Sequence, residues 1–213
     1  MSERLAWSLC LAAGLVLVGF TILLGSVENM RACDGVTALD PMIRFEWVRT
    51  VDDVRALFGE EPCRSTLAAA MDRSNRIDIF AYIPTFTLFQ LLAVWALRRH
   101  GRRLAIAATI AATAALPGDQ GQIDLLFWLV RVKFALLAFA AAGLGLLLAR
   151  ARGATRWHGY AMIGATAVAL AGLAEPRLLT AGIGLAWAAL LFAAAIRVVL
   201  LRPSSAASSS PPT

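Results

Sequence analysis

Charged residues are scarce in this chain of 213 residues. They make up 16% of the sequence, whereas hydrophobic residues make up 59%; in a typical soluble domain roughly a quarter of the residues are charged. The mean hydropathy is +0.69. This composition leaves too little polar surface for a soluble globule and predicts a membrane protein.

Histidine is also rare, and the motifs of several enzyme classes are missing. Only His100 and His158 occur, and both are expected at the edges of apolar runs. This excludes a haem-binding pair of histidines within a helix bundle and a histidine-rich metal site. The sequence contains no Gly-x-Ser-x-Gly, no His-Glu-x-x-His and no Walker-type glycine loop. We expect no cofactor and no metal, and we favour a protein that is not an enzyme.

Lysine is nearly absent as well, because nineteen of the twenty basic residues are arginines and Lys133 is the only lysine. A formal net charge of +6 is compatible with nucleic-acid binding, but many of the arginines lie at the ends of apolar runs. This placement is typical of topology signals in membrane proteins and not of a phosphate-binding face. We expect membrane lipids as partners, a membrane protein as a further candidate partner, and no nucleic acid.

What the sequence does contain is a series of six apolar runs. Most of them reach the roughly 20 residues that a helix needs to cross the hydrocarbon core of a bilayer. We therefore predict an all-α, polytopic transmembrane helix bundle that forms a single domain over residues 1–202. The expected spans are 5–27, 79–97, 104–122, 125–149, 157–174 and 178–200.

Arginines are concentrated in every second break between these runs. Those breaks hold Arg4, Arg98, Arg99, Arg102, Arg103, Arg150, Arg152, Arg156, Arg197 and Arg202. The other short breaks contain no basic residue or only Arg177. The positive-inside rule then predicts a multi-pass protein of a bacterial cytoplasmic (inner) membrane, with both termini in the cytoplasm and an exported loop at residues 28–76. That loop has seven arginines but also nine acids, and long loops are exported with less regard to charge.

The first run has an alternative interpretation as a cleaved signal peptide, because Arg4 precedes it. Its apolar stretch from Leu5 to Val27 is longer than a usual signal sequence and is not followed by a clean cleavage site. We therefore expect a retained span. At the other end, residues 203–213 are serine, alanine, proline and one threonine, a composition that predicts a disordered cytoplasmic tail.

Two of the three cysteines, Cys33 and Cys63, fall in the exported loop. In an oxidising compartment they are expected to pair and to close a loop of about thirty residues, which contributes roughly 3 kcal/mol in the chain-entropy model. A redox enzyme would need a Cys-x-x-Cys motif or a second pair, and the sequence has neither. Cys10 lies within the first span, where a thiol behaves as a small hydrophobe.

A short amphipathic helix is expected between the two loop cysteines. Thr50 is a typical N-cap residue, Asp52 and Asp53 follow in the first turn, and Gly59 is a stop signal. We expect this helix to pack on the outer membrane surface or on the bundle, with a partner-binding face as the alternative. Residues 65–71 also favour helix and are expected to continue into the second span.

The second span is unusually polar for a helix that faces lipid. Asp78, Tyr82 and Thr85 are four and three residues apart, so they share one helix face. Pro84 leaves a backbone carbonyl without its usual donor. Two interpretations of Asp78 remain open: an interfacial acid that headgroups or Arg76 neutralise, and a residue of a polar site.

The third run has only thirteen apolar residues before Pro117, too few to cross a roughly 30 Å hydrocarbon core. One explanation is a locally thinned bilayer. The other is that the polar stretch after Pro117 lies at membrane depth within protein, because irregular backbone is tolerated there only when protein or water surrounds it. The second explanation places Asp119, Gln120, Gln122 and Asp124 in a protected pocket.

Two basic residues, Arg131 and Lys133, lie inside the apolar part of the fourth span. Arg131 shares a helix face with Asp124, whereas Lys133 is expected on nearly the opposite side. Basic residues at this depth snorkel outward or pair with acids. Since Asp78, Asp119 and Asp124 are the available acids, we expect an ion-pair network near the outer leaflet. A purely structural role and a role in ligand binding or proton coupling both remain open.

Four short motifs resemble those of an uncharacterised family of bacterial polytopic membrane proteins with six helices. They are Phe45-Glu46-Trp47, Asp78-Ile79-Phe80-Ala81-Tyr82, Asp119-Gln120-Gly121-Gln122-Ile123 and Val132-Lys133-Phe134. That family has a glutamate in an exported helix, an Asp-x-x-Phe-x-x-x-Tyr second span, an Asp-x-x-Glu-Asn turn and a Lys-aromatic pair. In this chain the tyrosine spacing differs, and Gln122 and Ile123 replace Glu and Asn. The resemblance carries no known activity, but it implies that Glu46, Asp78, Tyr82, Asp119 and Lys133 belong to one site.

These observations support three hypotheses for the function. The first is a non-enzymatic protein that binds a lipid headgroup or a small solute in an outer-leaflet polar pocket. Its candidate ligand-binding residues are Glu46, Asp78, Tyr82, Asp119, Gln122, Asp124, Arg131 and Lys133. The second is a membrane-embedded enzyme that modifies a lipid or isoprenoid, with Asp78 or Asp119 as acid-base. The third is an assembly subunit of a membrane complex.

Glycines in and between the last three spans are expected at close helix contacts rather than in a phosphate-binding loop. They are Gly143, Gly145, Gly153, Gly159, Gly164 and Gly172.

Overall fold

The computed structural model describes residues 2–37, 39–114, 123–151 and 153–201, and these residues form an all-helical protein. The α-helices are α1 (Glu3–Gly25), α2 (Pro41–Glu46), α3 (Val51–Phe58), α4 (Cys63–Ile77), α5 (Ile83–Leu97), α6 (Arg102–Ala114), α7 (Ile123–Arg150), α8 (Arg156–Ala171) and α9 (Pro176–Leu200). A π-helix, η1 (Asp78–Tyr82), joins α4 to α5, and a 3₁₀ turn, η2 (Arg98–His100), follows α5. The predicted all-α class is confirmed for these residues. The predicted tail at 203–213 lies outside them.

Four helices within the described ranges are long and apolar enough to cross a membrane. They are Glu3–Gly25, Cys63–His100, Trp128–Arg150 and Pro176–Leu200. The chain is therefore a multi-pass membrane protein. The two remaining predicted spans contain α6 and α8, which have 13 and 16 residues and do not qualify by length. The predicted third span continues beyond α6 into residues outside the described ranges.

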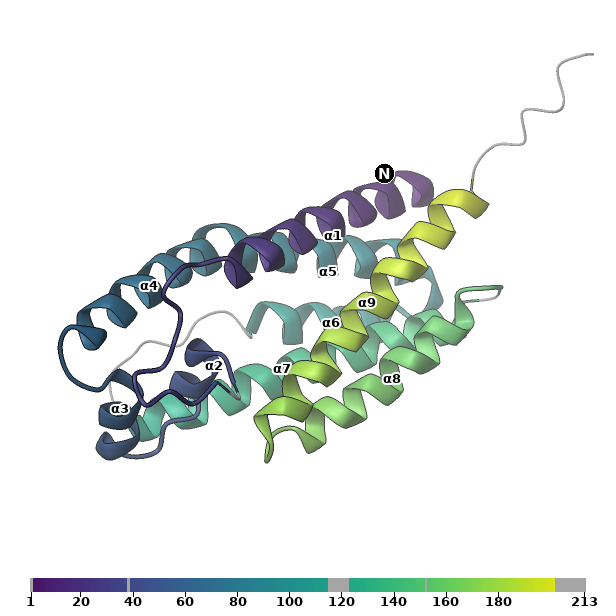
Figure 1. Ribbon diagram of the computed structural model, residues 1–213. Helices are drawn as coiled ribbons and strands as arrows, with labels where there is room; N and C mark the ends of the chain where they lie inside the picture. Colours follow the sequence, from purple (N-terminus) through teal and green to yellow (C-terminus); the bar gives the residue numbers. More distant parts are fainter. Residues whose placement is uncertain (1, 38, 115–122, 152, 202–213) are drawn as a thin grey trace, which may run out of the picture.

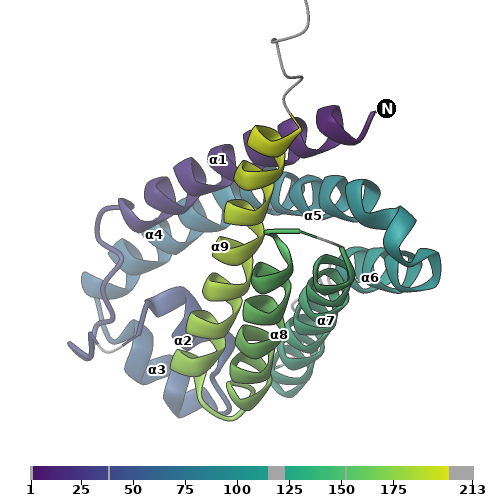
Figure 2. The same cartoon turned by 90° about the vertical axis from the view of Figure 1, so that its right-hand side faces the viewer.

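The long helices lie side by side and alternate in direction (Figure 1). One end of the bundle holds the start of α1, the α5–α6 turn, the α7–α8 turn and the end of α9; Figure 2 views the molecule from this side. We call it the arginine-rich end. Its arginines within the described residues are Arg4, Arg98, Arg99, Arg102, Arg103, Arg150, Arg156 and Arg197.

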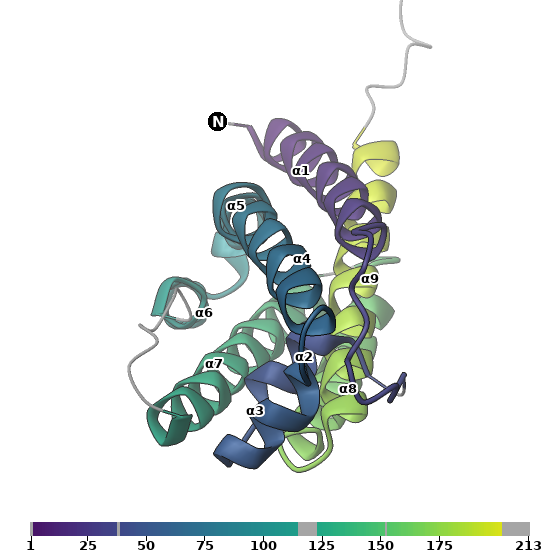
Figure 3. The same cartoon turned by 60° about the vertical axis from the view of Figure 1, so that its left-hand side comes forward.

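The opposite end of the bundle carries α2, α3 and the start of α4 (Figure 3). We call the segment around α2 and α3, between Glu28 and Pro62, the cap. Cys33 of the cap and Cys63, the first residue of α4, form the predicted disulfide. Leu57 of α3 is 1% exposed and packs with Leu67 and Met71 of α4. The amphipathic face of α3 therefore packs against α4.

The sequence signals around α3 and α4 are reproduced in the structure. The Thr50 hydroxyl accepts a hydrogen bond from the Asp53 N–H, and the Asp53 carboxylate accepts one from the Thr50 N–H, which completes a capping box. Gly59 ends the helix with a φ of +54°. α4 continues through η1 into α5 as one 38-residue helical segment that ends at His100, as predicted for residues 65–71 and the second span.

The core of the bundle lies between α1, α5 and α9. α1 buries Trp7 and Cys10 completely. The Trp187 ring of α9 packs edge to face against Phe86 and Phe89 of α5, with centroid distances of 4.8 and 6.2 Å. Because α1 supplies part of this core, it is an integral helix of the bundle.

Glycines bring α7, α8 and α9 into backbone contact. A Cβ atom added at Gly159 of α8 would lie 2.4 Å from the backbone nitrogen of Ala149 in α7. One added at Gly172 would lie 2.1 Å from the backbone nitrogen of Leu179 in α9. No side chain fits at either position without a shift of the neighbouring helix, so close packing here requires glycine.

The expected close contacts are also present at Gly143 and Gly145, where an added Cβ would have neighbours at 3.1 and 3.0 Å. The expectation is wrong for Gly153 and Gly164, because an added Cβ meets no atom within 4 Å at either position. Gly153 instead turns the chain with a φ of +104°. Gly164 lies on an exposed face of α8.

Candidate functional site

A single turn of π-helix interrupts the second span where the polar residues begin. In η1 the backbone N–H of Ile83 donates to the carbonyl of Asp78, five residues earlier. Pro84 has no N–H and its ring excludes the usual α-helical hydrogen bond at this point. The wider turn therefore follows from Pro84, and it lies next to the first polar side chains of the span.

Asp78, at the start of this π-turn, is partly buried. The charges of Lys133 and Glu46 both act on its carboxyl group. Arg76, which was one expected partner, instead pairs with Asp72 at 2.9 Å. Asp78 therefore lies within electrostatic range of Lys133 in α7 and of Glu46 in α2, and its neighbour Arg76 pairs elsewhere.

Tyr82 lies one turn further along the same helix. Its hydroxyl lies near the Thr21 side chain of α1 and within electrostatic range of Asp78. Its ring stacks on Phe86, with a centroid distance of 5.9 Å and an interplanar angle of 14°. These contacts hold Tyr82 between α1 and the aromatic core.

Lys133 of α7 forms an ion pair with Glu46, the last residue of α2. Its Nζ lies 3.0 Å from Glu46 Oε1. The two side chains are 32% and 25% exposed, so water screens the pair only in part. Lys133 Nζ also lies 5.1 Å from the centroid of the Phe134 ring. The ion pair joins the cap to α7.

A second contact between the same two helices lies beside it. The guanidinium carbon of Arg131 is 4.6 Å from the centroid of the Trp47 ring, a cation–π distance. Trp47 also packs against the small core formed by Ala138, Ala169 and Leu179. Consecutive cap residues Glu46 and Trp47 thus meet Lys133 and Arg131, which the helix period places on different sides of α7. The end of α2 therefore contacts two sides of α7.

We call Glu46, Asp78, Tyr82 and Lys133, with the Trp47–Arg131 contact beside them, the cap–bundle cluster. Among the predicted site residues, Glu46 and Lys133 are in direct contact, Asp78 lies within electrostatic range of both, and Tyr82 lies within range of Asp78. Asp119 and Gln122 lie outside the described residues, and Asp124 lies in α7 at a position whose side chain is outside them. Their expected place in the same site stays a prediction.

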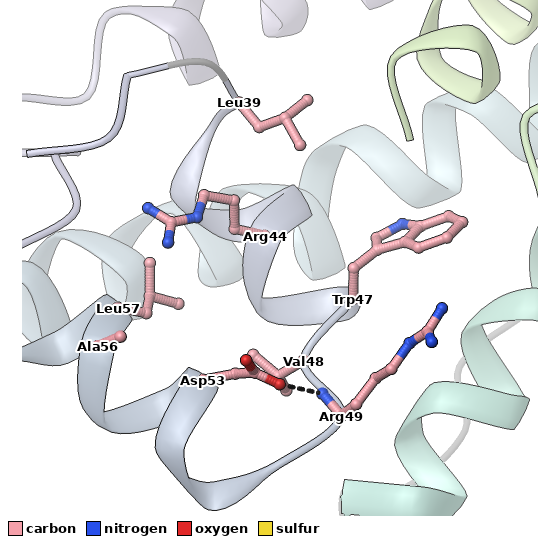
Figure 4. A pocket seen from close by; sticks show the side chains of 8 residues that line it. All are labelled: Leu39, Arg44, Trp47, Val48, Arg49, Asp53, Ala56 and Leu57. Carbon is pink, nitrogen blue, oxygen red and sulfur yellow. Dashed lines mark hydrogen bonds between the residues drawn. The ribbon is translucent and has the colours of Figure 1, made fainter. Parts of the chain in front are cut away.

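An open pocket of about 350 Å³ lies in the cap between α2 and α3 (Figure 4). It is lined by Leu39, Arg44, Trp47, Val48, Arg49, Asp53, Ala56 and Leu57. The Arg49 side chain extends beside Trp47 (Figure 4), and the Arg49 N–H donates to Asp53 at 3.0 Å. This hydrogen bond, together with those from Thr50, lowers the pKa of Asp53. The lining includes no predicted site residue, so this pocket is separate from the cap–bundle cluster, although Trp47 borders both.

Arg44 and Asp34 form an ion pair elsewhere in the cap. The distance between Arg44 Nη2 and Asp34 Oδ2 is 2.7 Å. The Arg44 guanidinium donates two hydrogen bonds to the Asp34 carboxylate. These bonds lower the pKa of Asp34 to about 2. The Arg44–Asp34 ion pair therefore stabilises the cap independently of the cap–bundle cluster.

Two residues of this region were not predicted from the sequence. Thr21 is an ordinary polar residue inside the first span, and no local pattern marks its contact with Tyr82. Trp47 follows Glu46 directly, and an aromatic residue next to a candidate acid was the only available signal. Within the described parts of the chain, the buried Nε1 of Trp47 has no hydrogen-bond partner.

The described residues contain no group of three or more histidine, cysteine or acidic side chains arranged to hold a metal ion. Comparison with protein-family models, with curated proteins and with solved structures finds no match to this chain. The resemblance of the four short motifs to a bacterial membrane-protein family therefore stays a prediction.

Proposed function

We propose that this multi-pass membrane protein binds a polar ligand, a lipid headgroup or a small solute, at the cap–bundle cluster. One observation carries the proposal: Lys133 pairs with Glu46 at 3.0 Å, and both charges act on Asp78 from a third segment. Charged groups next to hydrocarbon are costly, and ionisable residues within membrane spans are candidates for functional sites. The π-turn at Asp78 supports the same conclusion, because such turns recur at functional sites.

The charges of the cluster define the chemistry of this ligand. The cluster has two carboxylates and one ammonium group, and Glu46 already neutralises Lys133. A cationic group of a ligand would therefore approach Asp78, and an anionic group would compete with Glu46 for Lys133. A zwitterionic headgroup or solute, which carries both charges, satisfies both positions.

The depth of the cluster fits a ligand that enters from the cap side of the bilayer. α7 has 28 residues and is about 42 Å long, more than enough to cross a hydrocarbon core of roughly 30 Å. Trp128 is exposed, as expected for an aromatic residue at a membrane interface. Lys133 is five residues further in, or about 7 Å.

We further propose six crossings, with the arginine-rich end in the cytoplasm of a bacterial inner membrane. The alternating helix directions support six crossings, because α6 and α8 lie between full-length spans (Figure 1). The concentration of arginines at one end supports the orientation. At about 20 and 24 Å of helix, α6 and α8 need their flanking residues or a thinned bilayer to complete the crossing.

Cysteine labelling tests this topology. In a Cys10→Ala background, exposed positions are changed one at a time: Asp52→Cys in α3, Ala154→Cys in the α7–α8 turn and Ala174→Cys in the α8–α9 turn. In intact cells a membrane-impermeant maleimide should label the first and third variants and leave the second unlabelled. Labelling of Ala154→Cys together with Asp52→Cys would contradict the six-crossing proposal.

Native mass spectrometry of the full chain, released from native-lipid nanodiscs, tests ligand binding. Wild type should carry a discrete adduct whose mass identifies a lipid or solute. Asp78→Asn and Lys133→Met should lose most of the adduct while unfolding at temperatures that show a folded bundle.

Asp72→Asn is the matched control for Asp78→Asn. It makes the same chemical change on the same continuous helix, at a residue that pairs with Arg76 on the surface. The control should keep the adduct. If wild type carries no adduct, or all four proteins carry the same one, the binding proposal is wrong and the cluster serves only to hold the cap.

A further inference from the structure

A groove between α5 and α6 opens on the outer surface near the arginine-rich end, opposite the cap–bundle cluster. Its volume is about 470 Å³. The lining residues are Leu91, Val94, Trp95, Arg98, Arg102, Ala105, Ile106, Thr109 and Ile110. Figure 2 shows α6 at the edge of the bundle, beside α5 and α7.

The groove is apolar along most of its length. Val94 and Ala105, which are 7% and 4% exposed, form its floor. Trp95, Ile106 and Ile110 are exposed and form its rims. In a membrane this apolar lining contacts lipid acyl chains. Because the lining is concave, it can hold one acyl chain in a defined position.

The groove has a cationic end. Arg98 and Arg102 both lie at its α5–α6 turn, because α5 ends and α6 begins there. The Arg98 guanidinium stacks on the Trp95 ring, 3.9 Å from its centroid, and donates to the Trp95 carbonyl. These contacts hold the guanidinium at the end of the apolar surface.

Acidic residues do not neutralise this end. The sequence contains no Asp or Glu between Asp78 and Asp119. In the parts of the chain that the structure describes, the ion pairs involve none of the four arginines of this turn. The groove therefore presents an apolar track about 10 Å long that ends in two positive charges.

We propose that this groove binds one anionic phospholipid, with an acyl chain between α5 and α6 and the phosphate at Arg98 and Arg102. An anionic amphiphile fits the groove because each of its parts matches one part of the lining. Its acyl chain matches the apolar residues, its interfacial segment lies beside Trp95, and its negative charge matches the arginines. The site lies at the opposite end of the bundle from the cluster, so it does not depend on the proposed function.

The test compares two lipids on the full chain. Delipidated protein in detergent is titrated with phosphatidylglycerol or phosphatidylcholine that carry identical acyl chains, and native mass spectrometry gives the dissociation constant of the first bound lipid. Wild type should bind phosphatidylglycerol at least about tenfold more tightly, since each arginine near a lipid surface contributes about 1 kcal/mol. Equal affinity for the two lipids in wild type would overturn the proposal.

Two paired variants separate the groove from general electrostatic attraction. Arg98→Gln/Arg102→Gln should lose the preference for phosphatidylglycerol, whereas Arg99→Gln/Arg103→Gln should keep it. Both pairs remove two charges from the same turn, but Arg99 and Arg103 do not line the groove. Equal losses in the two pairs would overturn the proposal in favour of a diffuse surface charge.

A third variant tests the apolar part of the site. Thr109→Phe places a ring in the groove and leaves both arginines in place, so it should weaken the first phosphatidylglycerol at least about fivefold. Inorganic phosphate at millimolar concentration should not displace the lipid, because it lacks the chain. Unchanged affinity in a folded Thr109→Phe protein, or displacement by phosphate, would show that the groove does not hold the chain.

Discussion

Glu46 and Lys133 are 87 positions apart in the sequence, yet Oε1 of one lies 3.0 Å from Nζ of the other. The contact joins the end of α2, in the cap, to the long helix α7. Each side chain keeps about a quarter to a third of its surface exposed. The pair therefore lies between a screened surface ion pair and a buried one, and it links the position of the cap to the membrane-spanning part of the protein.

The Glu46–Lys133 pair should show a measurable coupling in a double-mutant cycle. Glu46→Gln and Lys133→Met should each lower the free energy of unfolding by about 1–2 kcal/mol, between the values typical of exposed and of buried pairs. The double variant should lose less than the sum of the two. Unfolding by denaturant in detergent micelles gives these values. Asp52 and Arg55, which are 87% and 75% exposed, form the control pair; a Glu46–Lys133 coupling no larger than theirs would contradict this prediction.

The disulfide should stabilise the cap and not the bundle. The Cys33→Ser/Cys63→Ser variant should lower the stability of the cap by roughly 3 kcal/mol, because the cross-link restricts its unfolded state. Limited proteolysis should then cut between α1 and α4 and leave the long helices intact. Cys10→Ala, which changes a buried thiol of the bundle, should leave the cap protected. A cap that resists protease without its disulfide would show that its small core is sufficient.

The Asp34–Arg44 pair should make the cap sensitive to acid. Since Arg44 lowers the pKa of Asp34 from 3.8 to about 2, the pair stabilises the folded cap above pH 4. That stabilisation is lost as the pH falls from about 4 towards 2 and Asp34 becomes protonated in the folded state. Amide hydrogen exchange of α2 should rise through this window. Asp34→Asn should exchange faster already at pH 5 and lose this part of the pH dependence; identical profiles for the two proteins would contradict the assignment.

Gly159 and Gly164 lie on the same helix, α8, and should respond in opposite ways to alanine. Gly159→Ala should lower the free energy of unfolding by about 2 kcal/mol or more, because the new methyl group meets the backbone of Ala149. Gly164→Ala meets no neighbouring atom and should be neutral or stabilise the helix by up to about 1 kcal/mol. Thermal unfolding in micelles measures both. Equal effects would show that α7 and α8 are not packed through Gly159.

Local features of this protein follow from its sequence because their causes are local. The apolar runs predict the long helices, since each run must shield its own backbone hydrogen bonds from lipid. Thr50, Asp53 and Gly59 predict the limits of α3 through groups that are close in the chain. The pairing of Cys33 with Cys63 follows from their shared loop. The glycine pattern predicted close packing, but it did not separate Gly159, which faces α7, from Gly164, which faces outward.

The site was predicted only as a set of residues, and the tertiary structure determined how they meet. A helix period shows that Asp78 and Tyr82 share a face, but it does not show that Asp78 lies within electrostatic range of Lys133. The π-turn before Pro84 has a local cause, but the packing of α2 across α7 depends on segments that are far apart in the chain. The composition and the positions of the charges determined a membrane protein with an arginine-rich end. Only tertiary packing placed Glu46 on Lys133 and Trp47 on Arg131, because contacts between distant segments have no local sequence pattern.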